Sequence, residues 1–234
     1  MESLLNFVRG PLLLFAFAVF FFGIARMLAL TAVEFVRAYR KAGDQAIPFS
    51  QLFRRSLGWI FPVNALRGKR IPYTVASAIF HVGMILVPIF LAGHIYLIKK
   101  GIGVEWLPLS PAAADLLTLM TIGALILLAL LRILDRASRA LSGFQDWFLL
   151  ALCFLPFLTG YWVAHPTANP FPFTLTYLIH LLSAEAILVL LPFTKLAHSA
   201  MFPFTQINWE LGWHFVPESG EKVRIALGKE GEPV

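Results

Sequence analysis

The sequence predicts an all-α integral membrane protein that crosses the bilayer with five helices. Of its 234 residues, 59% are apolar, the mean hydropathy is +0.76, and charged residues make up only 14%. A soluble domain has roughly 25% charged residues. A soluble fold would expose much of this apolar surface to water, whereas a bilayer removes that cost. We therefore expect a multi-pass protein of the cytoplasmic (inner) membrane.

Five apolar stretches are long enough to cross a hydrocarbon core of about 30 Å at 1.5 Å per residue. The first ten residues lack a basic n-region and a cleavage site, so we expect the first stretch to remain as a span. No internal repeat or low-complexity segment divides the chain, which predicts a single domain over residues 1–234. The expected spans are residues 11–33, 73–98, 112–134, 144–164 and 174–200.

Lys and Arg are unevenly distributed among the connecting loops. The loop of about residues 37–72 is strongly basic, whereas the loop 165–173 has no Lys or Arg. Because basic loops stay in the cytoplasm, we expect the N-terminus outside and the tail, about residues 203–234, inside. The mixed aromatic and basic segment 49–61 is typical of a helix in the membrane interface. Either anionic lipid or a soluble partner subunit would hold such a helix.

Four of the six histidines fall inside two of the expected spans, as two pairs. His81 and His94 belong to the second span, and His180 and His198 to the fifth. Polar groups in lipid are expensive and usually functional. Two histidines on each of two helices are what two bis-histidine haems in a helix bundle require. We therefore expect this chain to bind two haem b groups.

The spacing within each pair separates its members across the membrane. His180 and His198 are 18 residues apart, which is five whole turns and about 27 Å of rise, so they would share one face. His81 and His94 are 13 residues apart, about 19.5 Å of rise, and an ideal helix would turn them to different faces. A kink at Pro88 would reduce that difference.

The two spans run in opposite directions, because successive spans alternate. His81 is therefore expected to pair with His198 on the iron of an inner haem. His94 is expected to pair with His180 on the iron of an outer haem. His165, at the outer end of the fourth span, is the substitute ligand if His94 does not serve.

Other polar residues near the ends of the spans are candidates for further roles. His165 and Lys99 are candidate contacts for a quinone near the outer haem, although lysines in such places are more often interface anchors. Arg26 either pairs with an anionic haem propionate or extends to the membrane interface. Glu185, inside the fifth span, either relays a quinone proton or makes a structural hydrogen bond.

Two segments resemble the haem-bearing helices of the respiratory nitrate reductase gamma-subunit family: FHVGMILVPIFLAGH, residues 80–94, and LIHLLSAEAILVLLPFTKLAH, residues 178–198. That family includes membrane cytochromes b of heterodisulfide- and sulfite-reductase-linked complexes. The resemblance covers the five-span plan, and its specific parts are the 18-residue spacing and the ending LPFTKLAH. It implies that the haem ligands are His81, His94, His180 and His198. The second-span pair is spaced more widely here than in the nitrate reductase subunit. This difference favours a cousin of that subunit over the subunit itself.

These observations predict a dihaem cytochrome b subunit of a respiratory oxidoreductase. It would pass electrons between menaquinone or ubiquinone and an iron–sulfur subunit, with a catalytic subunit, on the cytoplasmic side. The one cysteine, Cys153, cannot ligate an iron–sulfur cluster, which needs about four ligands. We therefore expect clusters and any substrate-reducing site on other subunits, and no nucleic acid partner.

Two alternatives remain from the sequence. One is a haem-free membrane anchor or transporter, in which the histidines serve protons or substrate. The other is a cytochrome b linked to a hydrogenase or a formate dehydrogenase, although the 18-residue pair favours the first family.

Overall fold

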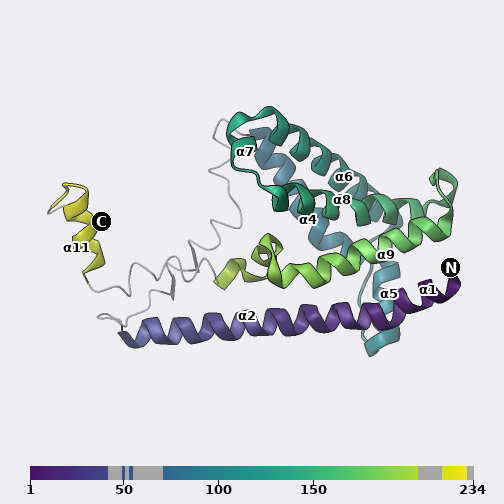
Figure 1. Ribbon diagram of the computed structural model, residues 1–234, viewed down its shortest axis with the longest axis horizontal. Coiled ribbons are helices and arrows are strands. Elements are labelled where there is room, and N and C mark those ends of the chain that lie inside the picture. The colour runs from purple at the N-terminus through teal and green to yellow at the C-terminus, as the bar shows by residue number, and fades with distance from the viewer. Residues whose placement is uncertain (42–48, 51–52, 55–70, 205–217, 231–234) are drawn as a thin grey trace. The chain divides into compact units, whose positions relative to one another are not determined.

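The computed structural model describes residues 1–41, 49–50, 53–54, 71–204 and 218–230, and within these ranges every regular element is a helix (Figure 1). The predicted all-α fold with five spans is confirmed at this level, while the sidedness of the termini stays a prediction. Most of the basic loop 37–72, including most of its segment 49–61, lies outside the described residues. The same holds for most of the tail 203–234. The helices in the described ranges that are long and apolar enough to cross a membrane are Glu2–Arg40, Ile71–Phe90, Pro111–Leu134, Phe144–Ala164 and Phe173–Phe193.

The chain separates into two compact units. The first unit comprises Met1–Phe17 and Asn64–Val189, and the second comprises Ala18–Val63 and Leu190–Val234. His81, His94 and His180 belong to the first unit, whereas His198 belongs to the second. Only the predicted outer haem site therefore falls within one unit, and a single domain over the whole chain stays a prediction.

The first span is longer than the predicted residues 11–33. The short helix α1 (Glu2–Phe7) continues through one π-helical turn (Val8–Leu12) into α2 (Leu13–Lys41). Pro11 lies in that turn, where its missing N–H removes one helical hydrogen bond. About 20 residues suffice to cross a bilayer, so part of this helix extends beyond the hydrocarbon core.

The stretch predicted as the second span, residues 73–98, is divided between two helices. The helix α4 (Ile71–Phe90) ends two residues after Pro88, and α5 (Ala92–Ile102) begins two residues later. Between them Leu91 is extended, with φ −71° and ψ 129°. The backbone thus turns between His81 and His94, and the helix-face argument for these two residues does not apply.

The last carbonyl groups of a helix have no partner within it, and at the end of α4 the following segment supplies donors. This explains how an apolar span can be interrupted, because each freed carbonyl is satisfied. The donors are the ring Nδ1–H of His94 to Pro88 (3.0 Å), the indole N–H of Trp106 to Ile89 (3.0 Å) and the backbone N–H of Leu109 to Phe90 (2.9 Å).

Close packing joins α4 to α6 (Pro111–Leu134), which lie side by side (Figure 1). Gly83 of α4 faces Thr121 of α6 so closely that a Cβ at residue 83 would overlap the threonine hydroxyl. The Thr121 hydroxyl donates to the Leu117 carbonyl at 2.6 Å, so its polar group is satisfied inside the interface. Small side chains commonly let membrane helices approach in this way.

The helix α8 (Phe144–Ala164) packs on the other side of α6 and follows the short helix α7 (Arg136–Ala140). Buried apolar side chains on these helices, such as Leu125 and Leu152, form the core of the first unit. The N-terminus of α6 is capped by Ser110, whose hydroxyl accepts a hydrogen bond from the Ala113 N–H at 3.3 Å. The first unit is therefore organised around α6.

The fifth span also departs from the predicted helix over residues 174–200. Its helix α9 (Phe173–Leu190) is followed by two 3-10 turns, Leu191–Phe193 and Lys195–Ala197. Pro192 cannot donate a backbone hydrogen bond and disfavours helical geometry in the residue before it. The prediction that His180 and His198 lie on one face of a single helix is therefore wrong, because the helix ends before His198.

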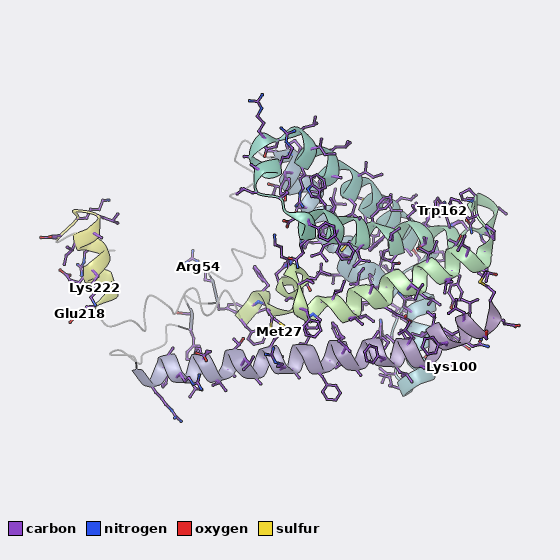
Figure 2. All side chains as sticks on the ribbon, in the orientation of Figure 1. Met27, Arg54, Lys100, Trp162, Glu218 and Lys222 are labelled. Carbon is purple, nitrogen blue, oxygen red and sulfur yellow. The ribbon has the colours of Figure 1, made fainter. Side chains whose placement is uncertain are left out.

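Two local features belong to the second unit. Pro192 packs against Gly23 of α2, where a Cβ would lie 2.5 Å from the Pro192 Cγ. In the tail, the helix α11 (Ser219–Ala226) carries exposed ion pairs, one of which joins Lys222 to Glu218 at 3.9 Å (Figure 2).

Candidate functional site

The five histidines within the described ranges share one feature, a hydrogen bond from Nδ1 to a backbone carbonyl. A carbonyl oxygen can only accept, so Nδ1 carries the hydrogen and Nε2 of the neutral ring keeps a lone pair. This second-shell bond fixes the orientation of a metal-binding imidazole. The bonds join His81 to Ser77 (2.7 Å), His94 to Pro88 (3.0 Å), His165 to Tyr161 (3.0 Å), His180 to Pro156 (3.0 Å) and His198 to Lys195 (2.5 Å).

The rings of His94 and His180 lie opposite each other in the first unit. Their centroids are 6.1 Å apart and their planes differ by 13°. Two imidazoles that bind one metal from opposite sides have ring centres about 6 Å apart, because each metal–nitrogen bond is about 2.0 Å long. Both residues are half-buried. The separation is therefore one at which His94 and His180 would be able to hold a single haem iron.

The His180 ring packs against helix α8. Pro156 of α8 provides the carbonyl that accepts from Nδ1. One turn later, a Cβ at Gly160 would lie 2.9 Å from Cε1 and 3.1 Å from Nδ1 of His180. Any larger residue at position 160 would push the ring. Sequence reasoning missed Gly160, and the available signal was a glycine one turn after a proline within an apolar span.

The two histidines predicted for the inner haem lie in different units. His81 is exposed on α4, and His198 is exposed just after the last 3-10 turn. Their pairing on one iron stays a prediction. Arg26 is exposed on α2, and its contact with a haem propionate also stays a prediction.

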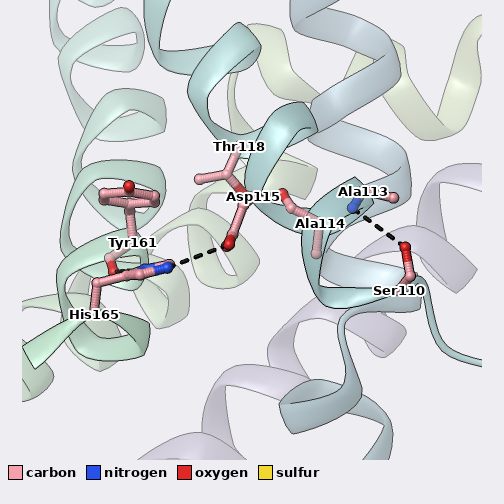
Figure 3. Close-up of polar contacts among 7 residues, drawn as sticks. All are labelled: Ser110, Ala113, Ala114, Asp115, Thr118, Tyr161 and His165. Carbon is pink, nitrogen blue, oxygen red and sulfur yellow. Dashed lines mark hydrogen bonds and ion pairs between the residues drawn. The ribbon is translucent and has the colours of Figure 1, made fainter.

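His165 differs from the other histidines because both of its ring nitrogens have polar partners. Its Nε2 lies 3.2 Å from Oδ2 of Asp115 (Figure 3). The Tyr161 ring stacks on the imidazole, with centroids 4.3 Å apart and planes 24° apart. The ring of His94 lies opposite that of His180, and the role of His165 as the substitute ligand stays a prediction.

The remaining candidates lie outside the histidine pair. Lys99, near the end of α5, forms an exposed ion pair with Glu105 at 2.5 Å, and its contact with a quinone stays a prediction. Glu185 of α9 is only 3% exposed. Neither carboxyl oxygen of Glu185 has a hydrogen-bond partner among the described residues, so the structural hydrogen bond considered for it is not found there.

Comparison with known proteins identifies a relative of similar length. A protein of Nitratidesulfovibrio vulgaris (strain Hildenborough) is 30% identical over 226 residues, which cover 93% of this chain and 96% of that protein. The chain belongs to the same family as that protein. This relative is described simply as "Protein", so family membership brings no stated activity to the chain. No protein-family model matches the sequence, and no solved structure matches it.

Proposed function

We propose that this chain is a dihaem cytochrome b subunit that carries electrons between a quinone and a cytoplasmic iron–sulfur partner. The observation that carries the proposal is the pair His94 and His180, whose ring centroids are 6.1 Å apart with planes 13° from parallel. A haem bound there supplies a one-electron carrier. His94 and His180 would hold the iron, and the carbonyls behind them would fix the orientation of the two imidazoles.

The hydrogen bonds behind the pair support this role. The carbonyls of Pro88 and Pro156 accept from the Nδ1–H groups, which directs both Nε2 lone pairs away from the backbone. These two carbonyls belong to the last turn of α4 and to α8. A shift of either element would therefore move the imidazole that its carbonyl orients, and hydrogen bonding behind a ligand is one means by which a protein tunes a haem.

Three parts of the proposal are argued from the sequence alone: the second haem, the orientation of the chain in the membrane, and the partner subunit. His81 and His198 would bind the inner iron, as the resemblance to the nitrate reductase gamma-subunit family implies. The basic loop would place that haem toward the cytoplasm. Reporter fusions near Lys69 and Asn169 test this, since the first should behave as cytoplasmic and the second as external.

A haem-free transporter is the second candidate, because a carboxyl group is buried inside the fifth span. Glu185 is buried without a hydrogen-bond partner among the described residues, and intramembrane carboxyl groups often belong to proton pathways. In that case the histidines would carry protons and bind no iron.

The absorption spectrum of the purified chain separates these functions. A dihaem cytochrome shows the sharp alpha band of reduced haem b after dithionite, and a pyridine haemochrome assay gives about two haems per chain. An absent alpha band in protein that retains its helical content would favour the transporter or anchor.

A further inference from the structure

The connection between α6 and α8 carries three arginines, which we call the arginine turn: Arg132, Arg136 and Arg139. Arg132 lies in the last turn of α6, and the other two belong to the short helix α7 (Figure 1). Arg136 and Arg139 are exposed, and Arg132 is half-buried. Both α6 and α8 are long and apolar enough to cross a membrane. The arginine turn should therefore lie at the membrane surface, where lipid headgroups meet water.

The two acidic residues of this connection accept hydrogen bonds from the first backbone N–H groups of the helices that follow them. The Asp135 carboxylate caps α7, where it accepts from Ala137 at 3.4 Å and from Ser138 at 3.2 Å. The Asp146 carboxylate accepts from the Gly143 N–H at 3.0 Å, at the start of α8. Capping of this kind stabilises a helix N-terminus. Among the residues that the structure describes, no acidic side chain forms an ion pair with the arginine turn.

The contacts that the arginines make within the turn leave much of their hydrogen-bonding capacity. The Arg132 guanidinium lies over the Trp147 ring, 5.7 Å from its centroid. Nη1 of Arg139 donates to the Ile133 carbonyl at 2.9 Å. A guanidinium has five N–H donors, so one hydrogen bond to a carbonyl uses only a small part of them. The planar array of donors matches the oxygens of a phosphate group.

Large apolar side chains are exposed beside the arginines. Leu134, Leu141 and Phe144 are 75%, 85% and 84% exposed. The Phe144 ring stacks on Phe148, with centroids 5.8 Å apart, so the apolar surface continues along α8. Inorganic phosphate would contact only the arginines, whereas a phospholipid presents a phosphate to the cations and acyl chains to the apolar side chains. Cations beside exposed apolar groups are typical of surfaces that bind anionic lipid.

We propose that the arginine turn binds the headgroup of an anionic phospholipid, such as phosphatidylglycerol, whose acyl chains lie against the exposed apolar side chains of the turn. The phosphate accepts hydrogen bonds from the guanidinium groups, and its negative charge is balanced by them. A zwitterionic lipid also has a phosphate, but its own ammonium group offsets the charge. The lipid would join the end of α6, the helix α7 and the start of α8. The proposal makes no use of haem or of the histidines.

The test uses the purified full chain in detergent, with dioleoylphosphatidylglycerol as the probe and native mass spectrometry to count bound lipid. One basic residue near an anionic headgroup contributes a factor of about five in affinity. Arg136→Gln should therefore weaken binding about fivefold, and exchange of Arg132, Arg136 and Arg139 together for Gln about 100-fold. Exchange of the three for Lys keeps the charge and should retain most of the affinity. Exchange of Lys99 and Lys100 of α5 for Gln is the matched control, and its affinity should equal that of the parent.

Two further probes identify what the turn recognises. Dioleoylphosphatidylcholine has the same acyl chains without a net charge, so it should bind more weakly and respond little to the arginine variants. Inorganic phosphate at the concentration of the lipid should not displace phosphatidylglycerol. Displacement by phosphate would show an ion site and overturn the proposal. Equal loss of affinity in the lysine control would also overturn it, because any surface cation would then serve.

The variants also separate a lipid from a soluble partner. Unchanged phosphatidylglycerol binding in the triple Gln variant would overturn the proposal. If a soluble acidic protein copurifies with the parent and is lost from that variant while lipid binding persists, the turn binds protein and not lipid. Circular dichroism checks that the variants keep the helical content of the parent. Arg136 is exposed on α7, so its single exchange preserves the fold and decides the matter even if the triple variant does not fold.

Discussion

Two sites in the first unit use histidine in the same way on one side of the ring and differently on the other. In the His94–His180 pair and in His165, Nδ1 donates to a backbone carbonyl. The His94 and His180 rings lie 6.1 Å apart between centroids, whereas Nε2 of His165 lies 3.2 Å from the carboxylate of Asp115. Two neutral imidazoles offer two lone pairs to a metal, whereas a carboxylate oxygen can only accept a hydrogen bond from an imidazole N–H. The two sites therefore differ in the group beside the histidine ring, which is a second imidazole in one and a carboxylate in the other.

The largest expected effect separates these two sites by haem content. His94→Ala removes an axial ligand and should reduce the haem content from about two per chain to about one. His165→Ala should leave both haems in place, because the imidazole beside His180 is His94. A pyridine haemochrome assay normalised to protein measures both variants. Loss of haem from His165→Ala alone would reverse the assignment.

The next effect tests the space that α8 leaves for the His180 ring. Gly160→Leu should displace the imidazole and remove the same haem as His94→Ala, since even a Cβ there would lie 2.9 Å from Cε1. Gly123→Leu is the matched control, because a Cβ at Gly123 in α6 meets nothing within 4 Å. The optical spectra after dithionite should show one haem in the first variant and two in the second. Equal spectra would mean that α8 does not shape the site.

A smaller effect, on stability, should reach the His94–His180 pair and the His165–Asp115 pair equally. Gly83→Val forces α4 away from Thr121 of α6, and overpacking of this kind typically costs about 1–3 kcal/mol. The helix α4 leads to His94, and α6 carries Asp115, the partner of the candidate quinone contact His165, so haem retention and oxidation of the quinol menadiol should decline together on heating. Thermal inactivation of both readouts checks this. A variant that loses one readout at its normal temperature and not the other would show that the sites do not share the α4–α6 packing.

The smallest effect should reach only the His94–His180 pair. Trp106→Phe removes the donor to the Ile89 carbonyl at the break after α4, and such a hydrogen bond contributes about 0.5–1.5 kcal/mol. We expect a modest shift in the midpoint potential of the outer haem, because the adjacent Pro88 carbonyl orients His94. The redox titration should leave the inner haem unchanged. A shift confined to the inner haem would contradict this account of the break.

Hydropathy sufficed to predict the five spans, because length and apolar content alone decide that property. It did not predict where helices stop inside an apolar stretch. The second and fifth spans contain Pro88 and Pro192, yet proline is tolerated in membrane helices where other groups satisfy the freed carbonyls. That compensation comes from residues such as Trp106, far along the chain, and no local pattern reveals it.

The candidate site was predicted in part, for a similar physical reason. Alternation of span direction placed His94 and His180 at the same side, and the structure brings their rings to 6.1 Å, while their role as ligands stays a prediction. Periodicity failed for both histidine pairs, since neither pair lies on one continuous helix. The contact between His165 and Asp115 joins residues 50 positions apart, and only the packing of α6 against α8 reveals it.

The central claim is that His94 and His180 bind one and the same haem iron, and a double-variant comparison tests it most directly. His94→Ala, His180→Ala and the double variant are purified, and the haem content and redox titration of each are compared with those of the parent chain. If one iron has both ligands, each single variant loses the same redox component and the double variant loses nothing more, leaving about one haem per chain. Two different components lost in the single variants, or both lost in the double variant alone, would contradict the claim.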